Sequence, residues 1–229
     1  MEHFNRFGNM SPTQEYMHRP YLMDRAPFQI RGNLYFVGNL WCSSHLIDTG
    51  EGLILLDTPC AGSMPGLIHN IWKLGFNPED LKYIIVSHAH TDHYACVNAL
   101  VHLSGAKTFL SAVDAKDMRE HPERMEAMNR ELGYYNESFV PDVELQDGDL
   151  IQLGNTIGVM SHFWTLQDGQ DTIRVGIYGG AGFVSVSEAA LRRNGMPLSL
   201  QQDFLTSIDK VWDEPVDLML GNHPFHNDT

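Results

Sequence analysis

The sequence has few basic residues and no long apolar run, and each of these shortages excludes a class of protein. Its 15 Lys and Arg stand against 29 Asp and Glu, which gives a formal net charge of −14. A surface of this charge repels phosphate, so neither nucleic acid nor an anionic membrane is expected as a partner. No run approaches the ~18 apolar residues of a membrane span. The sequence leaves the oligomeric state open.

Cysteines are also scarce. Cys42, Cys60 and Cys96 are widely spaced and contain no Cys-x-x-Cys pair, so they do not form a disulfide framework and favour a reducing compartment. The start Met1 to Arg6 lacks the basic and apolar regions of a signal peptide. If Met1 is the natural start, we expect a cytoplasmic protein, although a chain that had lost its leader would read the same way.

The length of 229 residues and the apolar fraction of 43% suffice for one sizeable domain with its own core. Residues 1–26 are polar and are expected to form an N-terminal arm, and residues 27–229 a single domain. Short strand patterns separated by turn signals predict one antiparallel sheet between Phe28 and Leu56. A second group of strand patterns, beginning at Val143–Leu145, predicts a second sheet. Helical patterns between and after these groups indicate an α/β fold.

The most informative stretch is Ser87–His93, which holds three histidines and one aspartate. It follows the strand pattern Tyr83–Val86, and imidazole with carboxylate suits zinc or another first-row transition metal. His88 and His90 are two residues apart and face the same side of an extended backbone. The turn that follows redirects Asp92 and His93 towards a second point, so the spacing allows two adjacent metals. The alternative is that these are ordinary surface histidines in a chain with 12 of them.

The pattern His-x-His-x-Asp-His after a hydrophobic strand resembles the signature of the metallo-β-lactamase superfamily. The resemblance covers roughly Phe28 to His226, and it implies a four-layer αβ/βα sandwich in which helices flank two mixed sheets. Further segments that resemble this family are Gly52–Thr58, Gly148-Asp149, Leu153-Gly154, Gly179-Gly180 and Asn222-His223-Pro224.

The resemblance also implies a ligand set. His88 and His90 would belong to a first zinc, and Asp92, His93 and His223 to a second. His223 follows an apolar strand pattern, so it too stands at a strand end. Asp57, at the end of another strand, has two readings: a helix cap, or a residue that orients the metal loop from behind the ligands.

The chain departs from the family pattern in two places. Between Ile157 and Gly158 we expect about ten residues to be missing, including the histidine that completes the first zinc in relatives, so this site should bind metal very weakly. His162 lies within a strand pattern and is a poor substitute. The stretch Gly179–Gly182 lacks the Asp that bridges both metals in many relatives. The chain also stops six residues after His223, where a closing helix is expected.

We therefore predict a zinc-dependent hydrolase of a small-molecule substrate, in which metal-bound hydroxide attacks a carbonyl of a β-lactam or another amide-like or ester-like bond. Asp92 would hold the second zinc and orient the nucleophile. The ligand pattern is closest to the third subclass of metallo-β-lactamases. The alternatives are a lactone or thioester hydrolase of the same fold, and a metal-binding protein that has lost its first zinc site and its activity.

Overall fold

The computed structural model describes residues 12–132, 135–159, 163–178, 186–193 and 195–224. The strands are β1 (Phe28–Arg31), β2 (Leu34–Phe36), β3 (His45–Asp48), β4 (Leu53–Leu56), β5 (Leu81–Ile85), β6 (Lys107–Ser111), β7 (Val143–Leu145), β8 (Leu150–Leu153), β9 (Thr156–Val159), β10 (Phe163–Asp168), β11 (Asp171–Tyr178) and β12 (Leu218–Gly221). The α-helices are α1 (Pro12–His18), α2 (Met64–Lys73), α3 (Thr91–Tyr94), α4 (Val97–Ser104), α5 (Ala112–Glu120), α6 (Pro122–Leu132), α7 (Glu188–Arg193) and α8 (Leu200–Trp212). Short 3₁₀ turns lie at Pro20–Met23, Ala61–Ser63 and Pro78–Asp80.

The first sheet has the strand order β1-β2-β3-β4-β5-β6-β7. Strands β1 to β4 pair antiparallel, whereas β4 to β7 pair parallel, so the sheet is mixed. The prediction that Val143–Leu145 opens the second sheet is wrong, because β7 pairs with β6. The reason is a contact just before the strand. The Asp142 carboxylate accepts hydrogen bonds from the backbone N–H and the hydroxyl of Thr108, both at 2.8 Å, and so fixes β7 beside β6.

The second sheet has the order β12-β11-β10-β9-β8, with β11 and β12 parallel and the other pairs antiparallel. Strand β9 continues through the junction between Ile157 and Gly158 and pairs with β8 on one side and β10 on the other. Glycine at 158 is required by packing, since a Cβ there would lie 2.5 Å from ring atoms of Trp164. The place where a longer segment is expected is therefore a continuous strand in this chain.

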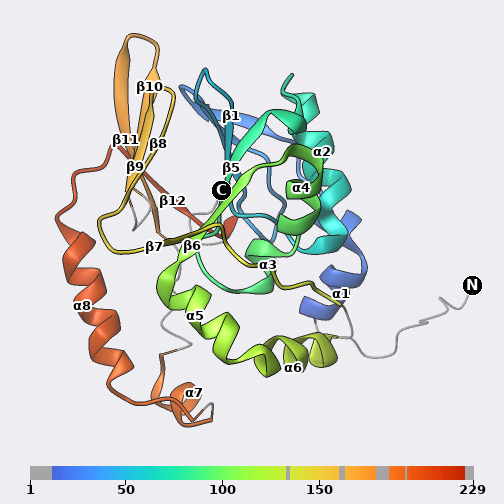
Figure 1. The fold of residues 1–229 in the computed structure, drawn as a ribbon, viewed down its shortest axis with the longest axis vertical. Helices are drawn as coiled ribbons and strands as arrows, with labels where there is room; N and C mark the ends of the chain where they lie inside the picture. The colour runs from blue at the N-terminus through green and yellow to red at the C-terminus, as the bar shows by residue number, and fades with distance from the viewer. Residues whose placement is uncertain (1–11, 133–134, 160–162, 179–185, 194, 225–229) are drawn as a thin grey trace, which may run out of the picture.

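Two apolar cores separate the layers. One lies between the first sheet and helices α2, α4 and α5, with Leu67, Ile71 and Leu100 among its buried residues. The other lies between the two sheets and is centred on Trp164, which is fully buried. In Figure 1, α2 and α4 cover the right-hand side of the first sheet, and α7 and α8 lie on the side of the second. The predicted architecture, an α/β sandwich of two mixed sheets flanked by helices, is confirmed.

The topology gathers several strand ends at one edge of the molecule. Because β4 and β5 are parallel, the segments that follow them, at Asp57 and at Ser87, leave the first sheet at the same end. Backbone bonds tie these segments together: the Asp57 N–H donates to the Ile85 carbonyl and the Thr58 N–H to the His93 carbonyl. No helix within the described ranges is long and apolar enough to cross a membrane.

Candidate metal centre

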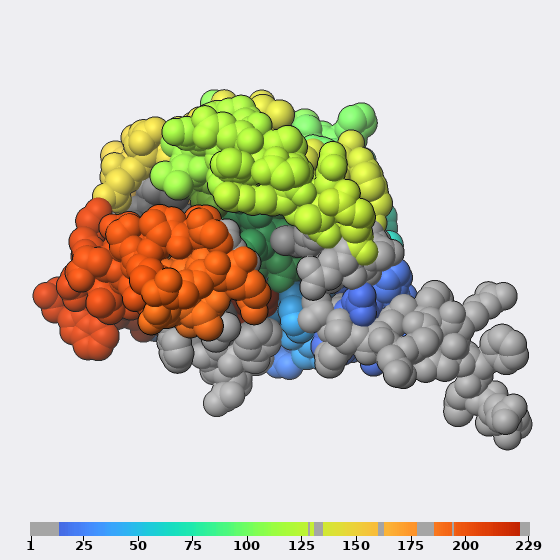
Figure 2. All heavy atoms as spheres, turned by 90° about the horizontal axis from the view of Figure 1, so that it is seen from below, coloured from blue at the N-terminus to red at the C-terminus, as the bar shows by residue number. Residues whose placement is uncertain are grey.

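The candidate site lies where the first sheet and the second sheet end side by side. The loop after β5 carries His88 and His90, the short helix α3 carries Asp92 and His93, and the segment after β12 carries His223. The Ser43 N–H donates to the Asn222 carbonyl at 2.9 Å, which ties the end of β12 to the first sheet. Figure 2 shows this edge from below, with green surface recessed between α5 and α6, α7 and α8, and the blue N-terminal part.

Asp92, His93 and His223 converge although 130 residues separate the two histidines. Their ligand atoms all lie within 4.8 Å of one another. The two histidine Nε2 atoms are 3.3 Å apart, and Asp92 Oδ2 lies 3.9 Å from that of His93 and 4.0 Å from that of His223. This is the same trio that the sequence assigns to the second zinc.

These distances fit a tetrahedral metal. Two nitrogen ligands bound at 2.0–2.1 Å with a tetrahedral angle between them stand about 3.3 Å apart, which is the separation of the two Nε2 atoms. The Asp92 oxygen is slightly further away.

The outer nitrogens of both rings are held by oxygen atoms. His93 Nδ1 lies 2.9 Å from Asp57 Oδ2, and His223 Nδ1 hydrogen-bonds to the Trp41 carbonyl. Since both partners accept, each neutral ring carries its proton on Nδ1 and directs the lone pair of Nε2 inward. Two facing lone pairs at this distance repel unless a proton or a metal cation lies between them, and the raised pKa of His93 favours a proton there in the metal-free chain. The chemistry of the donor set therefore fits zinc.

His88 and His90 form a second pair. His88 Nε2 lies 3.0 Å from His90 Nδ1, and the His88 ring is 4.2 Å from the His93 ring, centroid to centroid. Burial and the neighbouring charges of His93 and His90 lower the pKa of His88 to about 3, so its imidazole is neutral at pH 7. Among the described residues, the pair has no third His, Cys, Asp or Glu within ligand distance. His162, which its strand pattern makes a poor substitute for the missing histidine, lies outside the described residues.

Asp57 orients His93 of the trio and, through Ser87, His88 of the second pair. Its Oδ2 accepts from His93 directly and from the Ser87 hydroxyl at 2.7 Å, and that hydroxyl lies 2.9 Å from His88 Nδ1. Its Oδ1 accepts the Ser87 backbone N–H at 2.7 Å. The carboxylate is thus bonded to the metal loop, and the helix-cap reading of Asp57 is wrong. A φ of 59° at this non-glycine residue shows that the backbone is held in an unfavourable conformation to aim the side chain.

The pKa shifts favour an ionised Asp57 carboxylate beside a protonated His93. Burial acts to raise the pKa of Asp57, but His93, His88 and the Ser87 N–H outweigh it and lower that pKa to about 2. Burial acts to lower the pKa of His93, but Cys42 and Asp57 raise it well above its usual value. Burial also raises the pKa of the Cys42 thiol, which keeps it neutral, so the carboxylate of Asp57 carries the charge that acts on His93.

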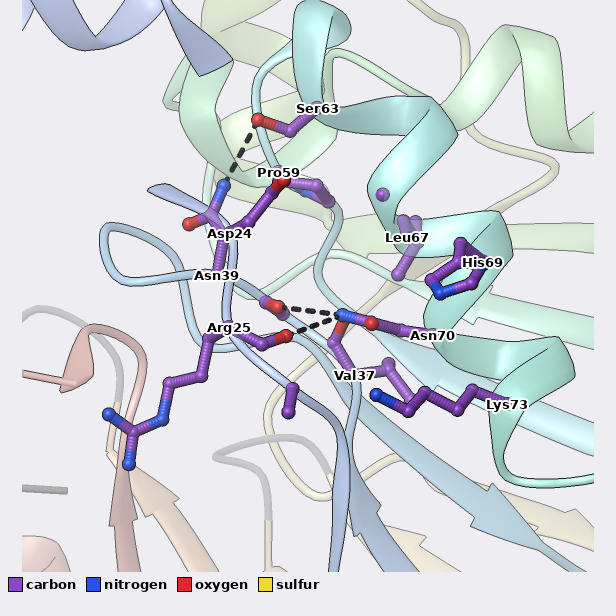
Figure 3. Close-up of a pocket in the computed structure, with 13 residues that line it drawn as sticks. Asp24, Arg25, Val37, Asn39, Pro59, Ser63, Leu67, His69, Asn70 and Lys73 are labelled. Carbon is purple, nitrogen blue, oxygen red and sulfur yellow. Dashed lines mark hydrogen bonds between the residues drawn. The ribbon is translucent and has the colours of Figure 1, made fainter. Parts of the chain in front are cut away.

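A separate hollow lies beside the site. It has a volume of about 260 Å³ and is lined by residues of α2, of the segment before β1 and of the segments that follow β2 and β4, among them His69, Lys73 and Asn39 (Figure 3). None of the five predicted metal ligands lines it. The hollow is therefore a different feature from the candidate metal centre.

A mixed-sheet sandwich with His and Asp ligands gathered at its strand ends is the architecture of a class of metal-dependent hydrolases. The family model of the metallo-beta-lactamase superfamily matches residues 38–213 of this chain. The chain therefore belongs to the metallo-β-lactamase superfamily, and the family resemblance seen in the sequence is confirmed.

Solved structures of metallo-β-lactamases, two of them described as class or subclass B3, are similar over nearly the whole chain. The di-zinc metallo-β-lactamase LRA-12 from an Alaskan soil metagenome is 25% identical, with a TM-score of 0.79, and the match covers 91% of this chain and 82% of that one. GOB-18 from Elizabethkingia meningoseptica is 26% identical, with a TM-score of 0.77, and the match covers 96% of this chain and 82% of that one. BJP-1 from Bradyrhizobium japonicum, a subclass B3 enzyme, is 27% identical, with a TM-score of 0.73, and the match covers 89% of this chain and 79% of that one.

Sequence reasoning missed two residues of the site. Trp41 contacts two of the three residues in the trio, and Cys42 lies 3.5 Å from His93 Nδ1. Both lie in the turn between β2 and β3, far from the histidine motif in sequence. The only signal for them was the position of this turn at the same end of the sheet as Asp57. The stretch Gly179–Gly182 and His226 lie outside the described residues.

Proposed function

We propose that this chain is a zinc-dependent hydrolase that cleaves the amide bond of a β-lactam or a related carbonyl compound. The observation that carries the proposal is the convergence of Asp92, His93 and His223, with both imidazoles held in the tautomer that binds metal. Zinc bound there would activate water and polarise a carbonyl group. Support for the β-lactam class comes from the B3 enzymes, to which the chain is similar over its length.

The residues of the chain have separable tasks in this proposal. His93 and His223 would supply nitrogen ligands through Nε2, His93 once it has given up its extra proton, and Asp57 and the Trp41 carbonyl fix their orientation. Asp92 supplies a carboxylate: burial acts to raise its pKa, but His93 and the hydrogen bond from Trp41 lower it, so it is ionised at neutral pH. Its Oδ2 would accept a hydrogen bond from the attacking nucleophile and so orient it. His88 and His90 would provide two nitrogens for a further metal beside it.

The test is hydrolysis by the zinc-loaded chain of three substrate types: a chromogenic cephalosporin, a lactone and a thioester. We expect cleavage of the cephalosporin and a loss of at least a hundredfold in kcat/KM for Asp92→Asn and for His223→Ala. His69→Ala, in the separate hollow, is the matched control and should retain the activity. Cleavage of the lactone or the thioester alone would change the substrate class. Full activity of the Asp92 and His223 variants would overturn the proposed site.

A further inference from the structure

Trp41 links two ligands of the candidate metal centre. Its indole N–H donates to Asp92 Oδ2 at 2.7 Å, and its backbone carbonyl accepts from His223 Nδ1. The indole also meets the His223 ring edge to face, with centroids 5.9 Å apart and planes at 82°. One residue therefore contacts both the carboxylate and the distant histidine of the trio.

The loop that carries Trp41 is held from several sides. The Asn39 side chain accepts the backbone N–H groups of Trp41 and Cys42, at 2.9 and 2.8 Å, and donates to the Ser63 hydroxyl at 3.1 Å. Figure 3 shows the last of these bonds at the edge of the hollow. The next residues on either side are also tied: Leu40 N–H donates to the Met23 carbonyl, and Ser43 N–H to the Asn222 carbonyl.

The N-terminal arm completes this support. The Tyr16 ring of α1 packs against the Trp41 ring with centroids 5.7 Å apart. Met17 and Met23, both buried, line a small space against the same indole. Trp41 is thus enclosed by the arm on one side and bonded to Asp92 and His223 on the other.

We propose that Trp41 is a positioning residue for the second metal. The indole N–H fixes the Asp92 carboxylate and the carbonyl fixes the His223 ring, so that both are oriented before the metal arrives. This inference rests on the proposed function, because it takes Asp92 and His223 to be ligands. Hydrogen bonds to metal ligands are worth roughly 10-fold to 100-fold in metal affinity. Because the loop around Trp41 is held by several hydrogen bonds, the loss of its indole N–H should weaken zinc binding by a factor in that range.

The test is Trp41→Phe, which removes the N–H and keeps an aromatic ring against Tyr16 and His223. Zinc affinity is measured by competition with a chromophoric chelator, and Trp72→Phe, an indole 62% exposed on α2, is the matched control. We expect Trp41→Phe to bind the tighter zinc about 10-fold to 100-fold more weakly, and Trp72→Phe to equal the wild type. Equal affinities in all three proteins would overturn the proposal.

A measurement on the wild type avoids the question of whether the variant folds. In protein labelled with ¹⁵N at tryptophan, the indole N–H resonance of Trp41 should shift when zinc is added, and the resonances of Trp72 and Trp212 should not. If zinc binds and no indole resonance moves, the inference fails while the metal site stands. If the wild type binds no more zinc than His223→Ala, the proposed function itself fails.

Discussion

Replacing Asp57 by asparagine tests whether one buried carboxylate holds both halves of the metal loop. Asparagine has nearly the same shape and tolerates the φ of 59° found here, so the backbone is not strained further. The amide is neutral, and in either orientation its NH₂ group faces a donor: His93 Nδ1–H and the Ser87 hydroxyl at the Oδ2 position, or the Ser87 N–H at the Oδ1 position. The substitution thus removes the charge and opposes at least one hydrogen bond.

The magnitude follows from the pKa of Asp57, which falls from 3.8 to about 2 on folding. A folded-state pKa below the unfolded value means that the carboxylate stabilises the fold above pH 4 and loses this effect as the pH falls through 2. At about 1.4 kcal/mol per pKa unit, the contribution at pH 7 is about 2 to 3 kcal/mol. The side chain is buried, so solvent does not screen this value.

The assay is urea unfolding at pH 7 in the presence of a chelator, which removes any contribution from bound metal. We expect Asp57→Asn to lower the free energy of unfolding by about 2 to 3 kcal/mol. The matched control is Asp48→Asn, because the Asp48 carboxylate, only partly buried, accepts a single bond from Gly50 N–H at 3.0 Å. It should cost less than about 1 kcal/mol. Equal losses in the two variants would refute the reasoning.

Two further predictions concern stability. Burial lowers the pKa of His45 to about 4, although the charge of Asp57 acts to raise it. Because the unfolded chain takes up this proton at a higher pH than the folded chain, the free energy of unfolding should fall by about 3 kcal/mol between pH 7 and pH 4. Urea unfolding of His45→Leu should show a flatter pH dependence, and an unchanged pH dependence would contradict the burial argument. Zinc at 100 times its dissociation constant should add about 2.7 kcal/mol and raise the Tm by roughly 5 to 10 °C, measured by calorimetry, and His223→Ala should abolish that rise.

The sequence predicted the parts of the fold that depend on local pattern and on strand order. The meeting of the Ser87–His93 segment with His223 was predicted from the family resemblance and from the place of both at strand ends, although the two strands belong to different sheets. The position of β7 did not follow, since it depends on the long-range bond between Asp142 and Thr108. Strand periodicity is the same in either sheet, and only that contact decides between them.

The surroundings of the ligands were harder to predict than the ligands. Histidine spacing predicts metal binding. The role of Trp41 instead depends on how Asn39, Met23 and Asn222 hold its loop, and the contacts with Met23 and Asn222 are distant in sequence. The orientation of Asp57 depends on a left-handed backbone conformation that no residue type nearby indicates. Ligand identity is a property of the motif, whereas ligand orientation is a property of the packed fold.

The asymmetry between the two halves of the site gives the last prediction, which concerns how many metals bind. Asp92, His93 and His223 offer three ligand atoms, whereas His88 and His90 offer two and have no third among the described residues. A four-ligand zinc site is worth roughly 10 to 16 kcal/mol, so one ligand carries about 3 to 4 kcal/mol. One ligand fewer should therefore weaken the first site by more than about a hundredfold.

A zinc titration followed by calorimetry and by metal analysis measures this difference. We expect one tight zinc per chain, lost in His223→Ala, and a second that binds at least a hundredfold more weakly and is lost in His90→Ala. Two sites within tenfold of each other would contradict the count of ligands. They would then require a third ligand from outside the described residues, for which His162 is the candidate, and His162→Ala should in that case weaken the first site alone.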